Sequence, residues 1–373
     1  MRIRKYLLCG LIVVSFASLS MRMDAKNNKK QNTAPEYIFT TVKANPITSI
    51  KNQMLSGTCW CFSTNSFLES EVMRMKNITD TTDFPDFSEA FVIGKSYRER
   101  AIKSVRLEGK FNFGAGSESE DVVDVVRDYG IVPQSAQPGA KYNKLFGPMR
   151  MDSKLAKYVK KISKSAKKAS DTTWIAGVDQ ILQTYLGASP DTFSVAGVTY
   201  TPSSYRDYLG IDPNNYISFT SYTHHPFYTE FPLEVPDNWR WDNLYNIPID
   251  EFMAIIDSSI MKGYTVAWGA DVTEPGFSYY GVAVLPKGTS ASQAARQSTF
   301  NDKTTTDDHG MLIYGIAKDQ NGNKFYMVKN SWGKSGDYKG IWYFSEDYVR
   351  LKTTSMMVNK DVLTPEISHK LGL

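Results

Sequence analysis

Apolar residues recur at helical spacing through much of the first half of the chain. The clearest case runs from Trp60 to Met75, where Phe67, Leu68 and Val72 share one side and no glycine or proline interrupts the stretch. Glycine follows two of the other predicted helices, at the position where it commonly ends a helix. Those other helices are predicted at Asp121 to Tyr129, Lys154 to Lys168 and Thr173 to Tyr185, and on the face Phe252, Ile255, Ile256, Ser259 and Ile260.

The last third changes to short apolar runs bounded by turn residues, which is typical of antiparallel strands. The predicted strands are Tyr264 to Val272, Met311 to Ala317, Lys324 to Lys329 and Ile341 to Phe344. The stretch from Tyr200 to Asn246 is rich in Tyr, Pro, Asp and Asn, so we predict irregular structure there. Helices first and strands later predict the α+β class, with two packed subdomains.

The N-terminus has the pattern of a secretory signal. Residues 1–5 form a basic head, and residues 7–19 form an apolar run that ends in small residues. The run is shorter than the roughly 20 apolar residues that span a bilayer, so no membrane span is expected after cleavage. We predict a signal peptide over residues 1–25, a mature domain over residues 26–373, and a secreted or periplasmic location. A buried N-terminal helix is the alternative.

Removing this segment changes the charge balance. The full chain carries +4, and residues 1–25 hold four basic residues against one acidic residue, which leaves about +1 on the mature chain. A charge so near zero gives no support for nucleic-acid binding. A solvated helix face explains the basic stretch 154–168, with an anionic partner as the alternative.

Cleavage would also leave two cysteines, Cys59 and Cys61. Neighbouring side chains in a C-x-C pair point apart on a helix or strand, so the two rarely bridge each other. We therefore expect no disulfide framework. A free thiol in an exported protein needs a reason, and catalysis is a good one.

Cys59 lies where the turn Ser56-Gly57-Thr58 meets the predicted helix. At a helix N-terminus the unpaired N–H groups and the dipole, equivalent to about +0.5 charge, favour an anion such as a thiolate. Attack on a carbonyl creates an oxyanion, for which the backbone N–H of Cys59 and the side-chain amide of Gln53 are candidate donors. A lone cysteine at a helix start is more often a core residue, so the position alone decides nothing.

His309 is the candidate base. It lies just before a predicted strand, and Asn330 follows 21 residues later at the end of the next strand. An Asn carbonyl can accept the imidazole Nδ1–H and fix the tautomer, as the third member of a Cys-His-Asn set. Trp332 is placed to shield that bond from water. Taken alone, a histidine before a strand is more often a surface or capping residue.

Three separated segments together resemble the signatures of papain-like cysteine peptidases. In chain order they are Gln53-Met54-Leu55-Ser56-Gly57-Thr58-Cys59-Trp60-Cys61-Phe62-Ser63, Asp308-His309-Gly310 and Asn330-Ser331-Trp332-Gly333. The closer resemblance is to the branch of bleomycin hydrolase and bacterial aminopeptidase C. Segments similar to that branch are Asp86 to Phe91, Tyr129 to Pro133 and Gly269 to Val272.

The resemblance covers about residues 40 to 350 and implies a papain-like fold with insertions. A helical lobe would carry Cys59, and a β-rich lobe would carry His309 and Asn330. The resemblance implies that the mature domain is a cysteine peptidase domain, with Gln53 completing the catalytic set and no metal or other cofactor. It also implies a peptide substrate, cleaved through a thioester, and a homo-hexamer.

Four features depart from that branch. Residues 26–52 are too few for the inhibitory propeptide of papain-like zymogens. Ser119, after Gly116-Ser117, stands where the branch has a tryptophan after a Gly-Gly pair, which puts the substrate-pairing edge in doubt. The branch is typically intracellular. Its C-terminal arm enters the cleft and holds the substrate's amine, whereas only about 17 residues follow Met356 here, a tail predicted too short to reach the nucleophile.

Several functions remain open at this point. Aminopeptidase activity is favoured over endopeptidase activity by the branch, and thiol acyl transfer to an amine would use the same residues. An inactive papain-like binding protein is a different class. A metal site built from Cys59, Cys61, His224 and His225 is another, but these spacings do not match the common zinc patterns. Cys61 is expected to face the core instead.

Overall fold

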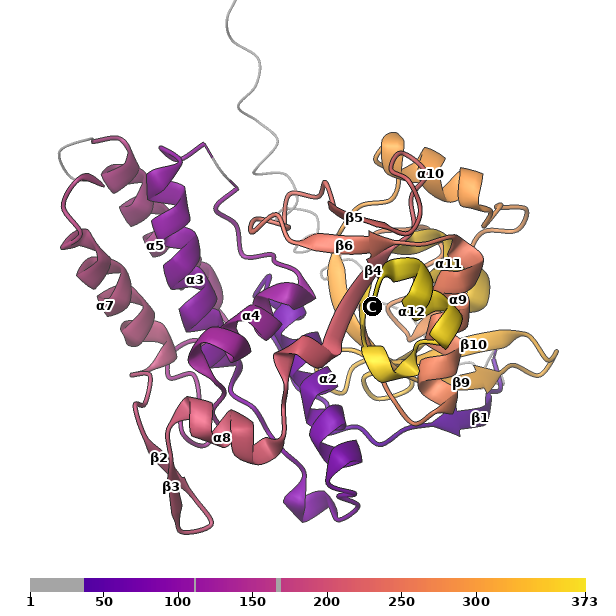
Figure 1. Ribbon diagram of the computed structural model, residues 1–373, viewed down its shortest axis with the longest axis horizontal. Helices are drawn as coiled ribbons and strands as arrows, with labels where there is room; N and C mark the ends of the chain where they lie inside the picture. The colour runs from indigo at the N-terminus through magenta and orange to yellow at the C-terminus, as the bar shows by residue number, and fades with distance from the viewer. Residues whose placement is uncertain (1–36, 111, 166–168) are drawn as a thin grey trace, which may run out of the picture. The chain divides into compact units, whose positions relative to one another are not determined.

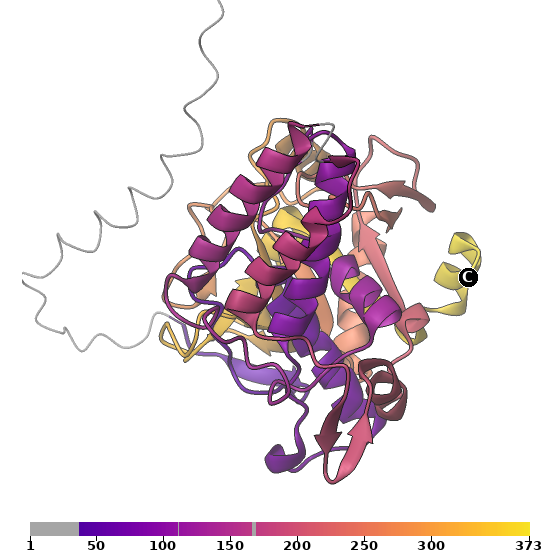
Figure 2. The ribbon, with the colours of Figure 1, turned by 90° about the vertical axis from the view of Figure 1, so that its left-hand side faces the viewer.

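The helical and stranded halves of the chain separate into two lobes in the computed structural model (Figure 1). The structure describes residues 37–373 except residues 111 and 166–168, and residues 39–373 form one unit. The predicted signal peptide, residues 1–25, lies outside the described residues. Figure 2 faces the helical lobe, whose helices lie in front of the sheet.

The helical lobe is built from the first helices along the chain. They are α2 (Cys59–Met75), α3 (Glu89–Arg106), α4 (Ser119–Tyr129), α5 (Gly147–Ser163), α7 (Trp174–Leu186) and α8 (Pro202–Leu209). The helices that pack with the strands are α9 (Ile249–Met261), α10 (Gln293–Asn301), α11 (Glu346–Lys352) and α12 (Pro365–Leu371). The predicted helices that begin near Trp60, Asp121 and Thr173, and the one on the Phe252 face, are confirmed.

The second lobe contains one large sheet with the strand order β5-β6-β4-β12-β7-β9-β10-β11-β8, and β1 pairs with β9. The strands are β1 (Thr40–Ala44), β4 (Tyr216–Thr220), β5 (Thr229–Pro232), β6 (Asn243–Asn246), β7 (Val266–Ala270), β8 (Val282–Ala283), β9 (His309–Lys318), β10 (Lys324–Lys329), β11 (Ile341–Ser345) and β12 (Thr353–Asn359). A separate hairpin joins β2 (Phe193–Val195) to β3 (Val198–Tyr200). The antiparallel β7–β9 pairing sets His309 opposite Ala270.

The prediction of irregular structure from Tyr200 to Asn246 was wrong. This stretch contains α8 and the strands β4, β5 and β6. The strands are four or five residues long, and β4 depends on β12, whose Met356 pairs with Phe219. Such short strands give little periodic signal, because their partners lie far away in the sequence.

Helix α2 lies between the two lobes and is buried from Trp60 to Met73. A helix can be buried on all sides only when other elements cover each of its faces. Gly310 makes the closest approach from β9, because an added Cβ there would lie 3.2 Å from the backbone N and Cα of Trp60 and 2.9 Å from Ser63 Oγ. A side chain at this position would push β9 away from the first turn of α2.

A buried lysine fixes the loop that precedes α2. The Nζ of Lys51 lies 3.1 Å from Glu69 Oε1 on α2, 2.7 Å from Glu89 Oε1 on α3, and 2.7 Å from Asp86 Oδ1. Glu89 is buried with it, and burial raises the pKa of its carboxyl group. Lys51 is therefore the ion-pair partner of both buried carboxylates, Glu69 and Glu89.

A second buried lysine joins the sheet to α2. Lys329, the last residue of β10, donates hydrogen bonds to Thr48 Oγ1 at 2.8 Å and to Ser66 Oγ at 2.9 Å. Burial lowers the pKa of Lys329 to about 8. The residue that follows, Asn330, is thereby held at a fixed place relative to the nucleophile helix.

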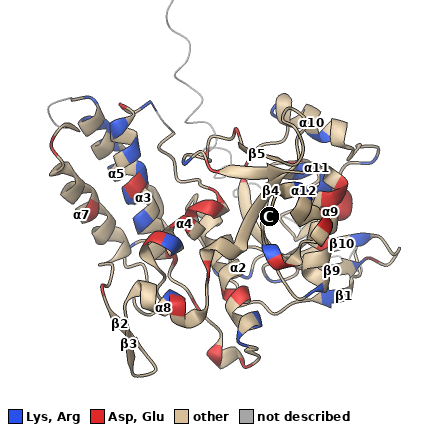
Figure 3. Ribbon diagram, viewed as in Figure 1, with Lys and Arg blue, Asp and Glu red and all other residues tan. Residues whose placement is uncertain are grey.

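The exposed face of α5 is basic. The lysines of α5 are exposed, opposite buried residues at 151, 155, 159 and 162, which fits the predicted solvated face (Figure 3). Lys167 and Lys168 of that predicted stretch lie outside the described residues. Among the described residues, no helix combines the length and the apolar character needed to cross a membrane.

We predict that Lys51→Met lowers the free energy of unfolding by about 3–5 kcal/mol, because the buried Glu69 and Glu89 lose the ammonium group with which they form ion pairs. Urea denaturation measures this change. Lys110→Met, which removes one partner of an exposed ion pair with Glu108, is the control and should leave the denaturation midpoint unchanged. An unchanged midpoint in Lys51→Met would contradict the assigned role of the network.

Candidate active site

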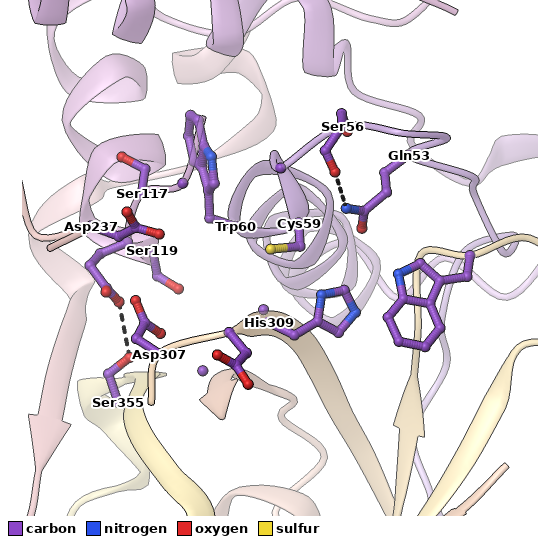
Figure 4. Close-up of a pocket in the computed structure, with 17 residues that line it drawn as sticks. Gln53, Ser56, Cys59, Trp60, Ser117, Ser119, Asp237, Asp307, His309 and Ser355 are labelled. Atoms are coloured by element: carbon purple, nitrogen blue, oxygen red, sulfur yellow. Dashed lines mark hydrogen bonds between the residues drawn. The ribbon is translucent and has the colours of Figure 1, made fainter. Parts of the chain in front are cut away.

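A cavity of about 280 Å³ opens between the lobes at the N-terminus of α2 (Figure 4). Both lobes line it. The lining residues include Gln53, Ser56, Cys59 and Trp60 around the start of α2, Gly116 to Ser119 before and at the start of α4, Asp237, Gly269 on β7, Asp307 to Gly310 around the start of β9, Trp332, and Ser355 on β12. The structure therefore brings the predicted Gln53, Cys59 and His309 to one cavity.

Cys59 is the first residue of α2 and is partly exposed. Its N-cap residue, Thr58, makes no side-chain capping bond, and its carbonyl accepts from the N–H groups of Cys61 and Phe62, so the N–H groups of Cys59 and Trp60 are the ones available to an anion. Burial raises the pKa of the Cys59 thiol to about 12, and the N–H groups of Gly310 and Trp60 act in the opposite direction. Nearby carboxylates raise it further, Asp307 most strongly.

His309 is buried and bonded to Asn330, as the sequence predicted. Its Nε2 lies 2.8 Å from Asn330 Oδ1. The predicted use of Nδ1 was wrong, because the ring presents its Nε2 edge to the end of β10, which leaves Nδ1 free of that bond. The indole of Trp332 stacks on the imidazole with ring centroids 4.6 Å apart, and so covers one face of the ring.

Before any proton transfer, the Cys59 thiol and the His309 imidazole are both uncharged. Burial lowers the pKa of His309 to about 4, although the Asn330 bond and the charge of Asp308 raise it. Transfer of the Cys59 proton to His309 creates opposite charges together, and their attraction opposes the desolvation that each charge meets alone. The arrangement suits a thiol that is deprotonated as it attacks.

The side-chain amide of Gln53 is fixed at both ends. Its Oε1 accepts a hydrogen bond from Ser331 Oγ at 2.5 Å, and its Nε2 donates to the carbonyl of Ser56 at 2.7 Å (Figure 4). The amide nitrogen carries two hydrogens, and among the described residues the Ser56 bond uses one. The second hydrogen is available to an oxygen atom in the cavity.

Three carboxylates in the cavity were missed by the sequence analysis. Glu118 accepts a hydrogen bond from Ser355 Oγ at 3.1 Å, drawn in Figure 4, and Asp237 and Asp307 lie beside it in the lining. Burial raises the pKa of Asp307 to about 6 and that of Glu118 well above its usual range. Of these three carboxylates, Asp307 could have been noticed in the sequence, because it directly precedes the Asp308-His309-Gly310 segment.

Comparison with known proteins identifies the family. The Peptidase C1-like family matches residues 11–372, nearly the whole chain. The chain belongs to the Peptidase C1-like family. This membership confirms the predicted resemblance to papain-like cysteine peptidases.

Relatives in this family extend over most of the chain. Aminopeptidase C from Lactococcus lactis subsp. lactis is 25% identical over 380 residues, which cover 89% of this chain and 84% of the relative. Aminopeptidase G from Lactobacillus delbrueckii subsp. lactis is 21% identical over 407 residues, covering 97% and 92%. The crystal structure of PepW from Lactobacillus rhamnosis superimposes with a TM-score of 0.71 at 18% identity, covering 89% and 84%. The α+β fold of the papain-like kind is therefore confirmed.

The structure does not form the metal site that combined the cysteines with the adjacent histidines. Cys61 is fully buried in the core, as predicted, and its thiol lies 3.7 Å from the carbonyl of Glu89. Among the described residues, the group with metal-like spacing is His224, His225 and Glu234, whose ligand atoms lie within 4.8 Å of one another. Direct bonds of 2.9 and 2.8 Å from the two Nε2 atoms to Glu234 already account for that cluster.

The buried carboxyl groups of this peptidase make its stability depend on pH. Burial raises their pKa values to about 7 for Glu120, Asp242 and Asp271, and to about 6 for Asp152 and Asp307. Unfolded Asp and Glu have pKa values of about 4, so the folded state holds more protons between pH 4 and 7. The stability from these groups is complete below about pH 4 and is lost as the pH rises through about 7.

We therefore predict a higher unfolding temperature at pH 5 than at pH 7.5. His309 acts in the opposite sense, since its folded pKa of about 4 lies below the unfolded value of about 6.5, but it is outnumbered by the carboxyl groups. Thermal unfolding between pH 4.5 and 8 measures the effect, and Asp242→Asn should flatten the curve. The exposed Asp302→Asn is the matched control. A temperature that rises steadily from pH 5 to 7.5 would overturn the prediction.

Proposed function

We propose that the protein is a cysteine aminopeptidase in which Cys59 is the nucleophile and His309 its base. Asn330 orients the imidazole, and Gln53 with the Cys59 N–H binds the oxyanion. The observation that carries the proposal is the shared cavity, which the first residue of α2 and the Asn330-bonded His309 enter from different lobes. Relatives named aminopeptidase C and aminopeptidase G, aligned over most of this chain, support the exopeptidase assignment.

The proposed reaction has two halves. Cys59 Sγ attacks the scissile carbonyl carbon while its proton passes to His309, and the oxyanion accepts hydrogen bonds from the Cys59 N–H and the Gln53 amide. His309 gives the proton to the leaving amine, so the C–N bond breaks and a thioester remains. Water, deprotonated by His309, then attacks the thioester, and the acid and the free thiol are released.

Endopeptidase activity is the second candidate, because the C-terminal tail lies away from the cavity. After β12 the chain forms α12, whose Ile367 and Leu371 join the core of the β-rich lobe. Lys370 on α12 lies 2.9 Å from Glu251 on α9. Among the described residues, none after Ser355 lines the cavity, so this tail does not obstruct a longer peptide.

Paired substrates distinguish the two activities. With residues 26–373, we expect cleavage of an aminoacyl-coumarin amide and no cleavage of its N-acetyl twin. Cys59→Ala should lower the rate by about 10⁴–10⁶-fold because the nucleophile is lost, whereas Cys61→Ala, a buried thiol on the same helix, should stay active. Cleavage of the acetylated twin would indicate an endopeptidase. If neither is cut and iodoacetamide does not label Cys59 selectively, the peptidase assignment is wrong.

We further propose that the protein is exported and acts outside the cytoplasm on peptides. The basic head and the apolar run of residues 7–19 support this location. Expression of the full chain in a bacterium should yield a mature protein that begins after Ser20 or Ala25, as measured by mass spectrometry of the exported fraction. Val13→Asp should block processing, and Asn27→Asp is the control. An unprocessed full-length chain in the cytoplasm would contradict the proposal. The hexamer stays a prediction.

A further inference from the structure

Four carboxylates share the cavity with the Cys59 thiol. Asp308 accepts hydrogen bonds from the hydroxyl groups of Thr273 and Thr306, and the other three are Glu118, Asp237 and Asp307. Glu118 precedes α4, Asp237 lies between β5 and β6, and Asp307 lies two residues before His309. Figure 4 shows Asp237 and Asp307 on the side toward which the Cys59 sulfur points, away from Gln53. None of the ion pairs found in the described part of the chain includes any of these three carboxylates.

Glu118 is the least satisfied of the three. Its side chain is buried, with 5% of the residue exposed, and one carboxylate oxygen accepts the Ser355 bond. The other, Oε1, has no hydrogen-bond partner among the described residues. A buried carboxylate oxygen without a partner is destabilising. Glu118 and Asp307 can form a side-chain hydrogen bond only when one of them carries a proton, because two ionised carboxylates have no hydrogen to donate.

Asp307 and Glu118 are close enough to influence each other's protonation. After burial, the charge of Asp307 is the strongest cause that raises the pKa of Glu118, and Asp237 acts in the same direction. Neighbouring buried carboxylates cannot all ionise without a positive charge between them. A proton shared between two of the carboxylates can supply this positive charge, and a bound cation would supply it in the same way.

Gly116 leaves room for the Asp237 side chain in the cavity. An added Cβ at Gly116 would lie 1.7 Å from Asp237 Oδ2, so the carboxylate occupies the space above this glycine. The charge of Arg100 acts on Asp237, but its guanidinium donates to the Gly114 carbonyl at 2.5 Å and to Ser117 Oγ at 2.6 Å. Arg100 thus holds the loop, and no ion pair joins it to the carboxylate.

We propose that Glu118, Asp237 and Asp307 form a subsite that binds a cationic nitrogen of the substrate beside Cys59. A primary ammonium group suits it, because it brings one positive charge and three donors to a set of acceptors. The inference rests on the proposed peptidase function, since the cation belongs to the peptide that Cys59 attacks.

The α-ammonium of the first residue is the favoured source of the cation. The cavity, about 280 Å³, is just below the roughly 300–1,000 Å³ typical of ligand pockets, and the carboxylates share it with the nucleophile. An ammonium group bound there is therefore within a short reach of the scissile carbonyl. A basic side chain on the residue before the scissile one is the other source, with the same ammonium or guanidinium chemistry.

The test compares Glu118→Gln with Glu120→Gln. Both remove a carboxylate from α4 or its N-cap, buried at Glu118 and partly buried at Glu120, but only Glu118 lines the cavity. We expect Glu118→Gln to lower kcat/KM for the free aminoacyl-coumarin amide by about 10–150-fold and to leave the acetylated twin unchanged. Glu120→Gln should keep the wild-type preference. Asp307→Asn is the second variant, in case the first fails to fold.

Three outcomes are decisive. If the acetylated substrates with Arg at the preceding position are preferred, and Glu118→Gln removes that preference, the subsite stands with a side chain as its cation. If Glu118→Gln slows all substrates equally and also slows alkylation of Cys59 by iodoacetamide, the subsite is wrong and the carboxylate only maintains the site. Loss of the free-amine preference alone supports the α-ammonium.

A binding measurement separates this inference from the peptidase assignment. Alaninamide, which carries an ammonium group, should protect Cys59 from iodoacetamide in the wild-type protein, whereas N-acetylalaninamide should not. Protection that disappears in Glu118→Gln supports the subsite even if the protein cleaves no substrate. Equal alkylation rates with and without alaninamide in the wild-type protein would overturn the subsite, whatever the peptidase assays show.

Discussion

A strand meets the N-terminus of a helix at Gly310, and the remaining parts of the site take their positions from that contact. The absence of a side chain lets β9 lie against Trp60 in the first turn of α2, and His309, the residue before it, reaches the cavity beside Cys59. The buried Lys51 and Lys329 fix the segments on either side of this contact. Buried charges of this kind tolerate little displacement, because each loses its partner when the lobes separate.

Opposing electrostatic effects act on the sulfur atom of Cys59. The N–H groups of Gly310 and Trp60 favour a thiolate, while burial and the charges of Asp307 and Asp237 disfavour it. A cation bound among the carboxylates cancels the unfavourable charge and leaves the N–H groups unopposed. In the proposed subsite, binding of the substrate's cation would therefore favour the thiolate form of Cys59.

Features determined by neighbouring residues in the sequence could be predicted. Features that depend on contacts between distant segments could not. Helix α2 was predictable from the spacing of Phe67, Leu68 and Val72. Cys59 and His309, which line one cavity, were singled out by segments that resemble the signatures of the family. The ring edge that bonds Asn330 was not predictable, because it depends on a rotamer set by packing against Trp332. Acidic residues such as Glu118 resemble ordinary surface residues until the fold buries them together.

The burial of α2 also governs when the protein can become active. Its surfaces are covered by elements from both ends of the chain, and β9 begins 250 residues after Cys59. At a synthesis rate of roughly 5–20 residues per second, His309 emerges from the ribosome about 12–50 s after Cys59. Throughout that interval the growing chain holds a cysteine without its histidine. With the catalytic roles proposed above, the nascent polypeptide is inactive until β9 has been added.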